Sequence, residues 1–556
     1  MTPPSQHLAT VLVDQLIAQG MTDLVLAPGS RSAPIAYAAW QRRDRLRLHV
    51  RIDERGAGFL ALGLARGTGR PVGVVTTSGT AAANLLPAVL EAHHSRIPLV
   101  AITADRPATM LHTGANQTTD QLALFGRHVR TDARLTATED APRAWAFQVA
   151  RALSAATGRR GATPGPVHLE VAFVDPLVPE SVPEVVPGVT EAPASSITAV
   201  DLGEWPAIPA PTQIPPDPGT VVVAGDLPPV RGRQVAERAA AARVPLLAEP
   251  SSNARHGATA IQTYRLLLDT ALGERISRVV MVGRPTLSRP VQRLLARRDV
   301  DLTVVDPSSE WIDPGLNAAR VVGDFSLSAT DPGLLEQWQR ADRRLGEGLA
   351  AEPDHGPGGV APLHLARAVV AHATGVLAHG ASNPIRDVDL VDFASGQAMV
   401  EHHANRGLAG IDGFVSTAYG IALADPERDT TALCGDLTFL HDSTGLVVGP
   451  DEPRPSALRY VVANDDGGSI FATLEHGRPE RAATFERLFG TAHHADLAAL
   501  CATSGTSHVR VERADQLVEV LAAPINGVEV IEVRVDRTDR PGQAARWQRL
   551  AADSVD

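Results

Sequence analysis

The sequence predicts an α/β protein with three domains, each built on a central parallel sheet. Its length of 556 residues is several times the roughly 100 to 200 residues that one domain usually needs. Along most of the chain, short apolar runs typical of buried strands alternate with helical patterns, which is the arrangement of parallel α/β sheets. Hydrophobic residues make up 44% of the chain and charged residues 21%, so the composition is that of a folded globular protein.

The first domain is expected over residues 1–180. Apolar runs predict its strands at residues 24–27, 72–76, 99–103 and 167–171. After them, residues 175–219 contain 11 prolines. Because proline neither continues a helix nor donates to a β-ladder, we expect this stretch to be a connection without regular secondary structure.

A central, Rossmann-like domain is expected over residues 195–350 and a third domain over residues 360–556, with a cluster of Pro and Gly between them at residues 353–359. A Rossmann-like domain raises the alternative of a dinucleotide-binding or regulatory protein, but no Gly-x-Gly-x-x-Gly motif opens a helix there. The predicted strands are residues 221–224, 279–282 and 302–305 in the central domain, and residues 432–434, 460–463 and 528–535 in the third.

Charge and residue usage exclude several classes of function. The net charge of −12 offers no electrostatic footprint for a nucleic-acid partner. All 51 basic residues are arginine, and without lysine the chain can neither form a Schiff base with pyridoxal phosphate nor build a Walker phosphate loop. Two cysteines in so long a chain make no disulfide framework, which favours the reducing cytoplasm. No apolar run reaches about 18 residues and no basic segment precedes the first apolar one, so neither a membrane span nor secretion is expected.

Two segments of the third domain carry acidic residues directly after predicted strands. Gly435-Asp436-Leu437 is followed, after 26 residues, by Asn464-Asp465-Asp466-Gly467-Gly468. Carboxylates at the ends of two parallel strands, beside glycines that let the backbone approach, can hold a hard divalent cation such as Mg²⁺, and that cation can bind a diphosphate. Two ordinary strand-to-helix turns are the alternative, because Asp and Gly are common turn residues.

The first domain carries a second group of polar segments where strands end. These are residues 27–31 (Ala-Pro-Gly-Ser-Arg), 51–55 (Arg-Ile-Asp-Glu-Arg) and 77–80 (Thr-Ser-Gly-Thr), with Asn84 nearby. Taken alone, Glu54 in the second of these segments is expected to be an exposed acid that pairs with Arg51 and Arg55.

Together, the two groups of segments resemble the thiamine-diphosphate-dependent decarboxylase superfamily. Its diphosphate motif is Gly-Asp-Gly followed at a distance by Asn-Asn, and a lone glutamate stands in its N-terminal domain. The resemblance covers essentially the whole chain and implies pyrimidine-binding, central and diphosphate-binding domains in that order. Within the superfamily, one branch condenses 2-oxoglutarate with isochorismate in menaquinone biosynthesis, and the chain resembles it at residues 28–31, 52–55, 103–107, 114–117, 405–407 and 410–413.

This resemblance implies a transferase that uses thiamine diphosphate and Mg²⁺, with Mn²⁺ as the alternative metal. The enzyme would decarboxylate 2-oxoglutarate and add the resulting succinyl carbanion to isochorismate by 1,4-addition. The family further implies a homodimer or a dimer of dimers whose active sites lie between subunits. Another thiamine-diphosphate-dependent 2-oxo acid decarboxylase or carboligase is the alternative, but a pocket with several arginines argues against a small monocarboxylic substrate.

The resemblance also implies roles for individual residues. The catalytic residues are Glu54, Arg386 and Arg406. The cofactor-binding residues are Glu54, Ser382, Gly407, Ile411, Gly435, Asp436, Leu437 and Asp465, and of these Ile411 could equally be plain core. The metal ligands are Asp436, Asp465 and the backbone of Gly467. The substrate-binding residues are Ser30, Arg31, Arg106, Asn116, Gln117, Arg289, Ser382, Arg386 and Arg406.

The sequence departs from the superfamily motif at two positions. Leu437 replaces the third glycine of the first motif, and Asn464-Asp465 replaces Asn-Asn. Alignment on the residues from Gly467 to Phe471 places Asp465 at the side-chain ligand position, whereas a shift of one residue would place Asn464 there. A carboxylate in place of an amide keeps oxygen coordination and adds attraction for the cation, so this departure is compatible with a metal site.

Overall fold

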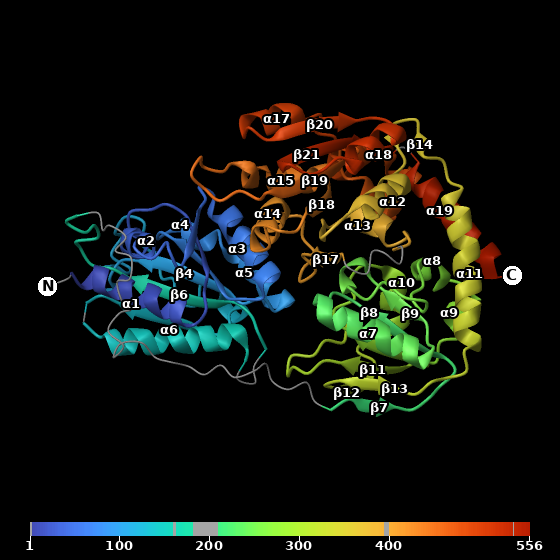
Figure 1. The fold of residues 1–556 in the computed structure, drawn as a ribbon, viewed down its shortest axis with the longest axis horizontal. Coiled ribbons are helices and arrows are strands. Elements are labelled where there is room, and N and C mark those ends of the chain that lie inside the picture. Colours follow the sequence, from blue (N-terminus) through green and yellow to red (C-terminus); the bar gives the residue numbers. More distant parts are fainter. Residues whose placement is uncertain are drawn as a thin grey trace. The chain divides into compact units, whose positions relative to one another are not determined.

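The computed structural model describes residues 3–138, 140–159, 163–181, 210–393, 400–537 and 539–555 (Figure 1). The chain forms two compact units. Residues 182–209, most of the predicted proline-rich connection, lie outside the described residues. Unit 1 comprises Met1–Ala207, Asp412–Glu427 and His441–Pro455, and unit 2 comprises Ile208–Ile411, Arg428–Leu440 and Ser456–Asp556.

Unit 1 contains a six-stranded parallel sheet with the strand order β2-β1-β3-β4-β6-β5. The four predicted strands are confirmed as β1, β3, β4 and β6, which are buried along their whole length. The edge strands β2 and β5 escape prediction because their side chains are only partly buried and form no apolar run. The strands are β1 (Asp23–Leu26), β2 (Arg47–Val50), β3 (Val72–Thr76), β4 (Leu99–Asp105), β5 (Asp132–Thr136) and β6 (Val167–Ala172).

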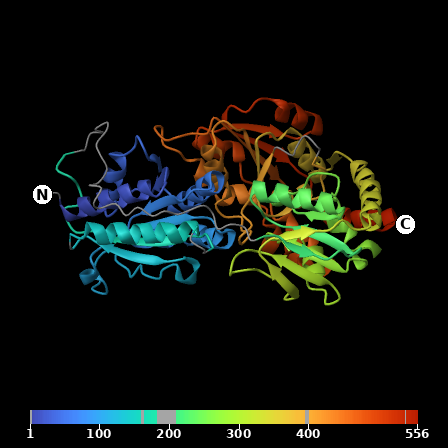
Figure 2. The same cartoon turned by 60° about the horizontal axis from the view of Figure 1, so that its bottom comes forward.

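Helices cover both faces of this sheet (Figure 1, Figure 2). One face packs against α1 (Pro4–Ala18), α2 (Ala33–Trp40) and α6 (Pro142–Thr157), whose apolar side chains share one core with the strands. The other face packs against α3 (Glu54–Thr68) and α5 (Leu86–Ser95), and α4 (Thr80–Ala83) precedes α5. Because neighbouring strands are parallel, the loops that follow them meet at one edge of the sheet.

Helix α14 (Phe414–Ala424), from the C-terminal part of the chain, also belongs to unit 1 and packs along α3. The two helices approach closely because each presents glycine at the contact. A Cβ at Gly63 would lie closer than 3.0 Å to the carbonyl oxygen of Thr417, and one at Gly420 equally close to that of Leu60. Only glycine permits this approach, which fixes the helix that begins at Glu54.

Unit 2 contains two larger sheets, and the central one has the order β12-β11-β10-β8-β9 with all strands parallel. The three strands predicted here are confirmed as β8, β10 and β11. The strands are β8 (Thr220–Ala224), β9 (Leu246–Ala248), β10 (Arg278–Val282), β11 (Asp301–Val305) and β12 (Ala318–Val322). The helices are α7 (Pro229–Ala242), α8 (Tyr264–Leu267), α9 (Ala271–Glu274), α10 (Arg289–Leu295) and α11 (Gly333–Ala350).

The expectation that residues 175–219 lack regular structure is wrong at one place. Thr212–Ile214 form strand β7, which pairs in parallel with β13 (Phe325–Leu327) in a separate two-stranded sheet. These three residues form a proline-free stretch between Pro211 and Pro215. Their N–H groups can therefore enter a ladder, and proline is tolerated beside an edge strand.

The C-terminal sheet of unit 2 has the order β17-β16-β18-β19-β21-β20, again with all strands parallel. The predicted strands are confirmed as β18, β19 and β21. The order repeats that of the unit 1 sheet strand for strand, although no short-period repeat is visible in the sequence. The strands are β16 (Val376–His379), β17 (Glu401–Ala404), β18 (Thr430–Gly435), β19 (Ala457–Asn464), β20 (Ser507–Val511) and β21 (Gly527–Arg534), and a hairpin of β14 (His355–Gly356) and β15 (Gly359–Val360) precedes them.

The α/β fold class is thus confirmed, and one apolar core runs through unit 2 from its central to its C-terminal sheet. We keep the division into domains 1–180, 195–350 and 360–556 as a proposal. In the described part of the chain, no helix is both long and apolar enough to cross a membrane. The remaining helices are α12 (Pro362–His372), α13 (Asn383–Val388), α15 (Asp436–His441), α16 (Ala482–Phe485), α17 (Leu497–Thr503), α18 (Ala514–Ala522) and α19 (Arg540–Val555).

The contact between α3 and α14 predicts that Gly420→Ala destabilises the protein. The added methyl group would overlap the backbone of α3, and overpacking of this kind typically lowers the free energy of unfolding by about 1–3 kcal/mol. Gly346→Ala in α11 is the matched control, because its Cβ would lie 3.6 Å from the nearest atom, Oε1 of Gln262. Urea unfolding followed by circular dichroism should show a lower free energy of unfolding for Gly420→Ala but not for Gly346→Ala. Equal stability of the two variants would contradict the close approach of the helices.

Candidate active site

A pocket of about 280 Å³ lies in unit 2, at the edge of the C-terminal sheet where the parallel strands end. Ligand sites in parallel sheets form at this edge, because loops that follow neighbouring strands meet there. The lining comes mainly from segments that follow β16, β18 and β19. The pocket brings together eight residues singled out from the sequence: Ser382, Arg386, Ile411, Gly435, Asp436, Leu437, Asp465 and Gly467.

Asp436 and Asp465 place two carboxyl groups in this pocket. Asp436 is buried, accepts hydrogen bonds from the N–H groups of Leu437 (2.6 Å) and Gly467 (2.9 Å), and lies 3.1 Å from Nε2 of His493. Burial raises the pKa of Asp436 even against these hydrogen bonds. Burial and the neighbouring charge of Asp436 raise the pKa of Asp465 to about 7. A buried and a partly buried carboxylate that repel each other form a donor set that fits a divalent cation.

Glycine shapes the backbone of both acidic segments. Gly467 has a φ of +143°, and a Cβ there would lie closer than 3.0 Å to the carbonyl oxygen of Gly490, so larger residues are excluded. A Cβ at Gly435 would meet no atom within 4 Å. The backbone at Gly435 is therefore open on one side and accessible to a group bound in the pocket, as the close approach of a diphosphate requires.

Asp465, and not Asn464, faces the pocket. Asn464 is buried, and its Nδ2 donates to Oε1 of Glu532 at 2.7 Å. Asp465 lines the pocket, whereas Asn464 is not part of the lining. The amide of Asn464 is thus engaged in a hydrogen bond to the neighbouring strand β21.

Arg386 lies in the pocket on α13, and its Nη1 donates to the carbonyl of Ser382 at 2.7 Å. Burial and the nearby cations Arg406 and Arg265 lower its pKa to about 10, so the guanidinium stays charged at neutral pH. Among the described residues, none places a carboxylate within 4.0 Å of this group. A partly buried guanidinium without a paired carboxylate is a site for an anionic ligand.

Arg406 follows β17 and is 2% exposed. Its Nε and Nη2 both donate to Oγ1 of Thr286, at 3.0 and 2.7 Å. Glu249 accepts hydrogen bonds from the N–H groups of Thr286 (3.2 Å) and Leu287 (2.8 Å). Burial raises the pKa of Glu249 to about 7 and outweighs the charge of Arg406, which acts to lower this pKa. Arg406 is thus held by Thr286, close enough to Arg386 to lower its pKa.

Besides Arg406, two residues of unit 2 that were singled out from the sequence lie outside the lining of this pocket. Arg289 begins α10, and its side chain is 64% exposed and forms a two-pronged ion pair with Glu475 at 2.9 and 3.3 Å. Gly407 is buried directly after Arg406. The pocket thus contains neither residue, and the exposed pair at Arg289 adds little stability.

In unit 1, Glu54 is the first residue of α3 and is half-buried. Its Oε2 accepts a hydrogen bond from Nδ2 of Asn84 at 3.2 Å. Asn84 caps the C-terminal end of α4, which follows β3. One hydrogen bond therefore orients the carboxyl group at the strand-end edge of the sheet.

The alternative in which Glu54 pairs with Arg51 and Arg55 differs from the arrangement observed. Arg51 lies 3.8 Å from Glu452, and Arg55 lies 4.0 Å from Asp442. Both arginines thus approach other carboxylates. The recorded ion pairs of the described residues do not include Glu54.

Arg106 and Gln117 gather around Ser78 at the same edge of the unit 1 sheet. Arg31, whose Nη1 donates to the carbonyl of Phe173 at 3.3 Å, lies near enough to sense the charge of Arg106. Nη1 of Arg106 donates to Oγ of Ser78 and to the carbonyl of Gln117, both at 2.7 Å, and Nε2 of Gln117 donates to the carbonyl of Ser78 at 2.8 Å. Burial and the charge of Arg106 lower the pKa of Arg31. Two guanidinium groups that repel each other fit an anionic ligand. Ser30 and Asn116 belong to the same loops and are exposed.

Three residues of these sites are absent from the residues assigned from the sequence: Ser78, Thr286 and His493. Ser78 lies in a segment that the sequence does single out, directly after β3, so its position gives a signal for it. Thr286 and His493 are far from their partners Arg406 and Asp436 in the sequence, and no local pattern marks them. Only the fold identifies these two.

Comparison with known proteins relates the whole chain to one group of enzymes. Residues 6–124 match the family model described as thiamine pyrophosphate enzyme, N-terminal TPP binding domain. Three proteins named 2-succinyl-5-enolpyruvyl-6-hydroxy-3-cyclohexene-1-carboxylate synthase are similar over nearly the full length. The one from Kineococcus radiotolerans is 48% identical (99% of this chain, 98% of the relative). The one from a Nocardioides species is 47% identical (97% of this chain, 96% of the relative). The one from Mycobacterium avium is 41% identical (96% of this chain, 97% of the relative).

Repulsion within the carboxylate pair predicts that, in the presence of a chelator, Asp465→Asn raises the melting temperature by an amount that depends on pH. The pKa of Asp465 is 3.8 in its reference state and about 7 when folded. The folded protein therefore binds the extra proton between these values, and wild-type stability falls as pH rises from about 4 to 7. The variant has no carboxyl group at this position and does not lose this stability. Its melting temperature relative to wild type should therefore rise between about pH 4 and pH 7. Added Mg²⁺ should narrow the difference at pH 8.

Asp466→Asn is the matched control for this experiment. Burial raises the pKa of Asp466, but the N–H groups of His494 and His493 outweigh burial and lower it overall. Removing that carboxylate should therefore cost stability at neutral pH, and the cost should shrink in acid. A melting-temperature difference for Asp465→Asn that stays constant between pH 5 and pH 8 would contradict the repulsion between Asp436 and Asp465.

Proposed function

The chain belongs to the 2-succinyl-5-enolpyruvyl-6-hydroxy-3-cyclohexene-1-carboxylate synthase family, and from this premise we propose the reaction that it catalyses. The reaction is decarboxylation of 2-oxoglutarate and 1,4-addition of the remaining succinyl unit to isochorismate, in menaquinone biosynthesis. The chain is accordingly a thiamine-diphosphate-dependent transferase that forms a carbon–carbon bond. One observation carries the proposal for the site: a carboxylate pair and a guanidinium without a paired carboxylate share the pocket at the strand ends of the C-terminal sheet.

Asp436, Asp465 and the backbone carbonyl of Gly467 would hold Mg²⁺, with Mn²⁺ as the alternative. A hard cation with oxygen ligands relieves the repulsion between the two carboxylates and can bind a diphosphate at the same time. When bound, thiamine diphosphate supplies the electron sink that lets a 2-oxo acid lose CO₂ and its acyl unit act as a nucleophile. Gly435, Leu437, Ser382, Gly407 and Ile411 are the further residues that we assign to cofactor binding.

Glu54 would hydrogen-bond a ring nitrogen of the aminopyrimidine. A carboxyl group in that position would exchange a proton with the ring nitrogen, so that no histidine base would be needed there. The hydrogen bond from Asn84 supports this role, because it orients the carboxyl group without the charge of a salt bridge.

Both proposed substrates are dicarboxylates, and guanidinium groups bind carboxylates through two parallel hydrogen bonds. We assign Arg386, Arg406 and Ser382 to the part derived from 2-oxoglutarate. The charges of Arg386 and Arg406 support this, because Arg386 lines the acidic pocket and the buried Arg406 lies close enough to lower the pKa of Arg386. We assign Ser30, Arg31, Arg106, Asn116 and Gln117 to isochorismate. Arg289 is the least supported assignment, because it already pairs with Glu475 at the surface.

We also propose a homodimer or dimer of dimers in the cytoplasm, with each active site shared between subunits. Glu54 lies in unit 1 and Asp436 in unit 2, yet both are assigned to one small cofactor. In the superfamily, the pyrimidine-binding domain of one subunit faces the diphosphate-binding domain of its partner. Both cysteines are buried and free, which supports a reducing compartment, and the net charge of −12 argues against nucleic acid.

Supplying isochorismate, 2-oxoglutarate, thiamine diphosphate and Mg²⁺ tests the reaction directly. Mass spectrometry should detect the condensed product together with released CO₂. Release of CO₂ from 2-oxoglutarate without condensation would favour the alternative, another thiamine-diphosphate-dependent 2-oxo acid decarboxylase or carboligase.

Glu54→Gln should preserve the fold and largely abolish turnover, because an amide cannot exchange the proton that a carboxyl group exchanges. General acid–base contributions are typically about 10²- to 10⁴-fold, and the turnover number should fall in that range. Glu427→Gln, which changes an exposed glutamate in unit 1, is the matched control and should retain full activity. Near wild-type turnover of Glu54→Gln would exclude this role for Glu54.

A shared site predicts complementation between two inactive variants, Glu54→Gln and Asp436→Asn. When the two chains are co-expressed, random pairing makes about half of the dimers mixed, and each mixed dimer has one intact and one doubly defective site. About a quarter of wild-type activity should then return. If both residues of a site came from the same chain, every site would contain a defect, and the mixture would be as inactive as either parent.

A further inference from the structure

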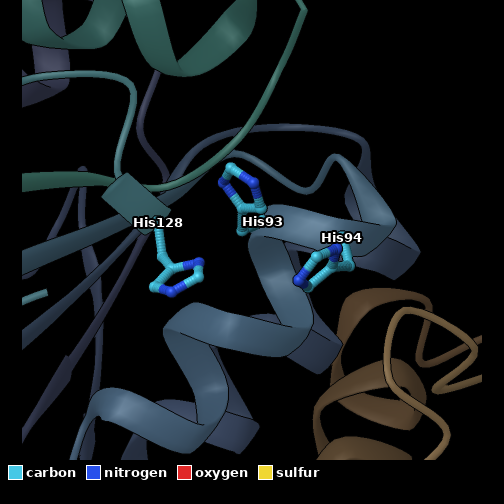
Figure 3. Close-up of side chains that lie close together, drawn as sticks. All are labelled: His93, His94 and His128. Atoms are coloured by element: carbon cyan, nitrogen blue, oxygen red, sulfur yellow. The ribbon is translucent and has the colours of Figure 1, made fainter. Parts of the chain in front are cut away.

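We propose that His93, His94 and His128 in unit 1 form a binding site for a divalent transition metal ion, best matched by Zn²⁺. One ring nitrogen of each residue lies within 4.8 Å of one ring nitrogen of each of the others. Figure 3 shows the three imidazoles grouped between the last turn of α5 and a neighbouring loop. The ring centroid of His93 lies 4.9 Å from that of His94 and 5.4 Å from that of His128. None of these residues takes part in the reaction proposed above, so the metal proposal does not rest on it.

The two elements that carry the three histidines, α5 and the 3-10 helix η2 (Gly126–His128), are anchored in the core of unit 1. His93 and His94 lie in the last turn of α5, whose Ala88, Val89 and Ala92 are buried. His128 ends η2, and its N–H donates to the carbonyl of Phe125 at 3.1 Å. Phe125 is 1% exposed and packs edge-on against His168. The histidine side chains are thus carried by fixed backbone.

Ligand chemistry favours a zinc-like ion. Three neutral imidazoles suit Zn²⁺, Ni²⁺ and Cu²⁺ and suit the hard ions Mg²⁺ and Ca²⁺ poorly. Zn–N bonds of about 2.0–2.1 Å in a tetrahedron place the ligand nitrogens roughly 3.3 Å apart. The observed nitrogens lie within 4.8 Å of one another, so the side chains must rotate to bring them closer when an ion binds. The C-terminal end of a helix, which carries a partial negative charge, further favours a cation near His93 and His94.

A bound ion would join α5 to the end of a functional loop. The chain between β4 and β5 carries Arg106 and Gln117, which we assign to the second substrate, and η2 lies at the end of this loop. Packing of the rings is the alternative description, since the ring of His93 stands edge-on to those of His94 and His128, at 85° and 88°. The two descriptions differ in whether the chain binds a transition metal through these residues.

Cobalt titration of the full-length chain, expressed without a histidine tag and stripped of metal, tests the site. Excess Mg²⁺ keeps the oxygen-ligand pocket occupied, and the visible absorption of Co²⁺ reports imidazole coordination. We expect one tightly bound equivalent that stoichiometric Zn²⁺ displaces. His93→Ala and His128→Ala should each weaken it by about 100-fold or more, because loss of even an outer-shell partner typically costs about 10- to 100-fold. Hydrogen exchange should slow in residues 91–96 and 126–130 when Zn²⁺ binds.

Two control variants identify the site. His112→Asn changes an exposed histidine of the same loop, and asparagine tolerates its φ of +62°, so Co²⁺ binding should be unchanged. His494→Ala probes a second group of potential ligands, since His494 lies 2.8 Å from Asp466. Melting temperatures without metal should match the parent for all variants, which excludes misfolding. Co²⁺ binding that survives in His93→Ala and His128→Ala, or that is lost only in His494→Ala, would overturn the proposal.

Discussion

The carboxyl ends of neighbouring parallel strands lie at one edge of a sheet, and every assignment in this chain depends on that constraint. The two six-stranded sheets share one strand order, so their functional segments correspond pairwise. In unit 1, segments after β1, β2, β3 and β4 carry Arg31, Glu54, Ser78 and Arg106. In unit 2, segments after β16, β17, β18 and β19 carry Arg386, Arg406, Asp436 and Asp465. One topology used twice thus supplies two polar edges, and we propose that each of them binds one half of the extended cofactor.

Burial of charge at these edges explains why the absence of lysine is compatible with the proposed chemistry. The pKa of Arg386 falls to about 10 in its buried site, and the guanidinium remains charged at neutral pH. A lysine starts at about 10.4 instead of 12.5 or more, so the same burial would bring its pKa near neutrality. Arginine also offers a planar fork that matches a carboxylate. A chain that binds dicarboxylates at buried sites therefore gains from arginine at each of them.

The sequence predicts those parts of the fold that local pattern determines. Buried strands such as β4 and β18 read as apolar runs, whereas the edge strands β2 and β5 are half-exposed and do not. The repeated strand order is invisible because it is a property of pairing between distant segments. In the same way, the sequence indicates which residue types follow the strands, but it does not reveal the hydrogen bond from Arg406 to Thr286. The exposed ion pair of Arg289 with Glu475 is likewise a tertiary feature that resemblance does not reveal.

The position of Glu54 shows most clearly how distant segments complete a site. Its two sequence neighbours are both tied to His441–Pro455: Asp53 accepts a hydrogen bond from Oγ1 of Thr444 at 2.8 Å, and Arg55 donates to the carbonyl of His441 at 2.7 Å. The helix that begins at Glu54 packs on α14 through Gly63 and Gly420. Residues nearly 400 positions away in the chain therefore set the place of one carboxyl group. A glutamate in this local sequence has the right chemistry, but only the fold of unit 1 gives it a fixed direction.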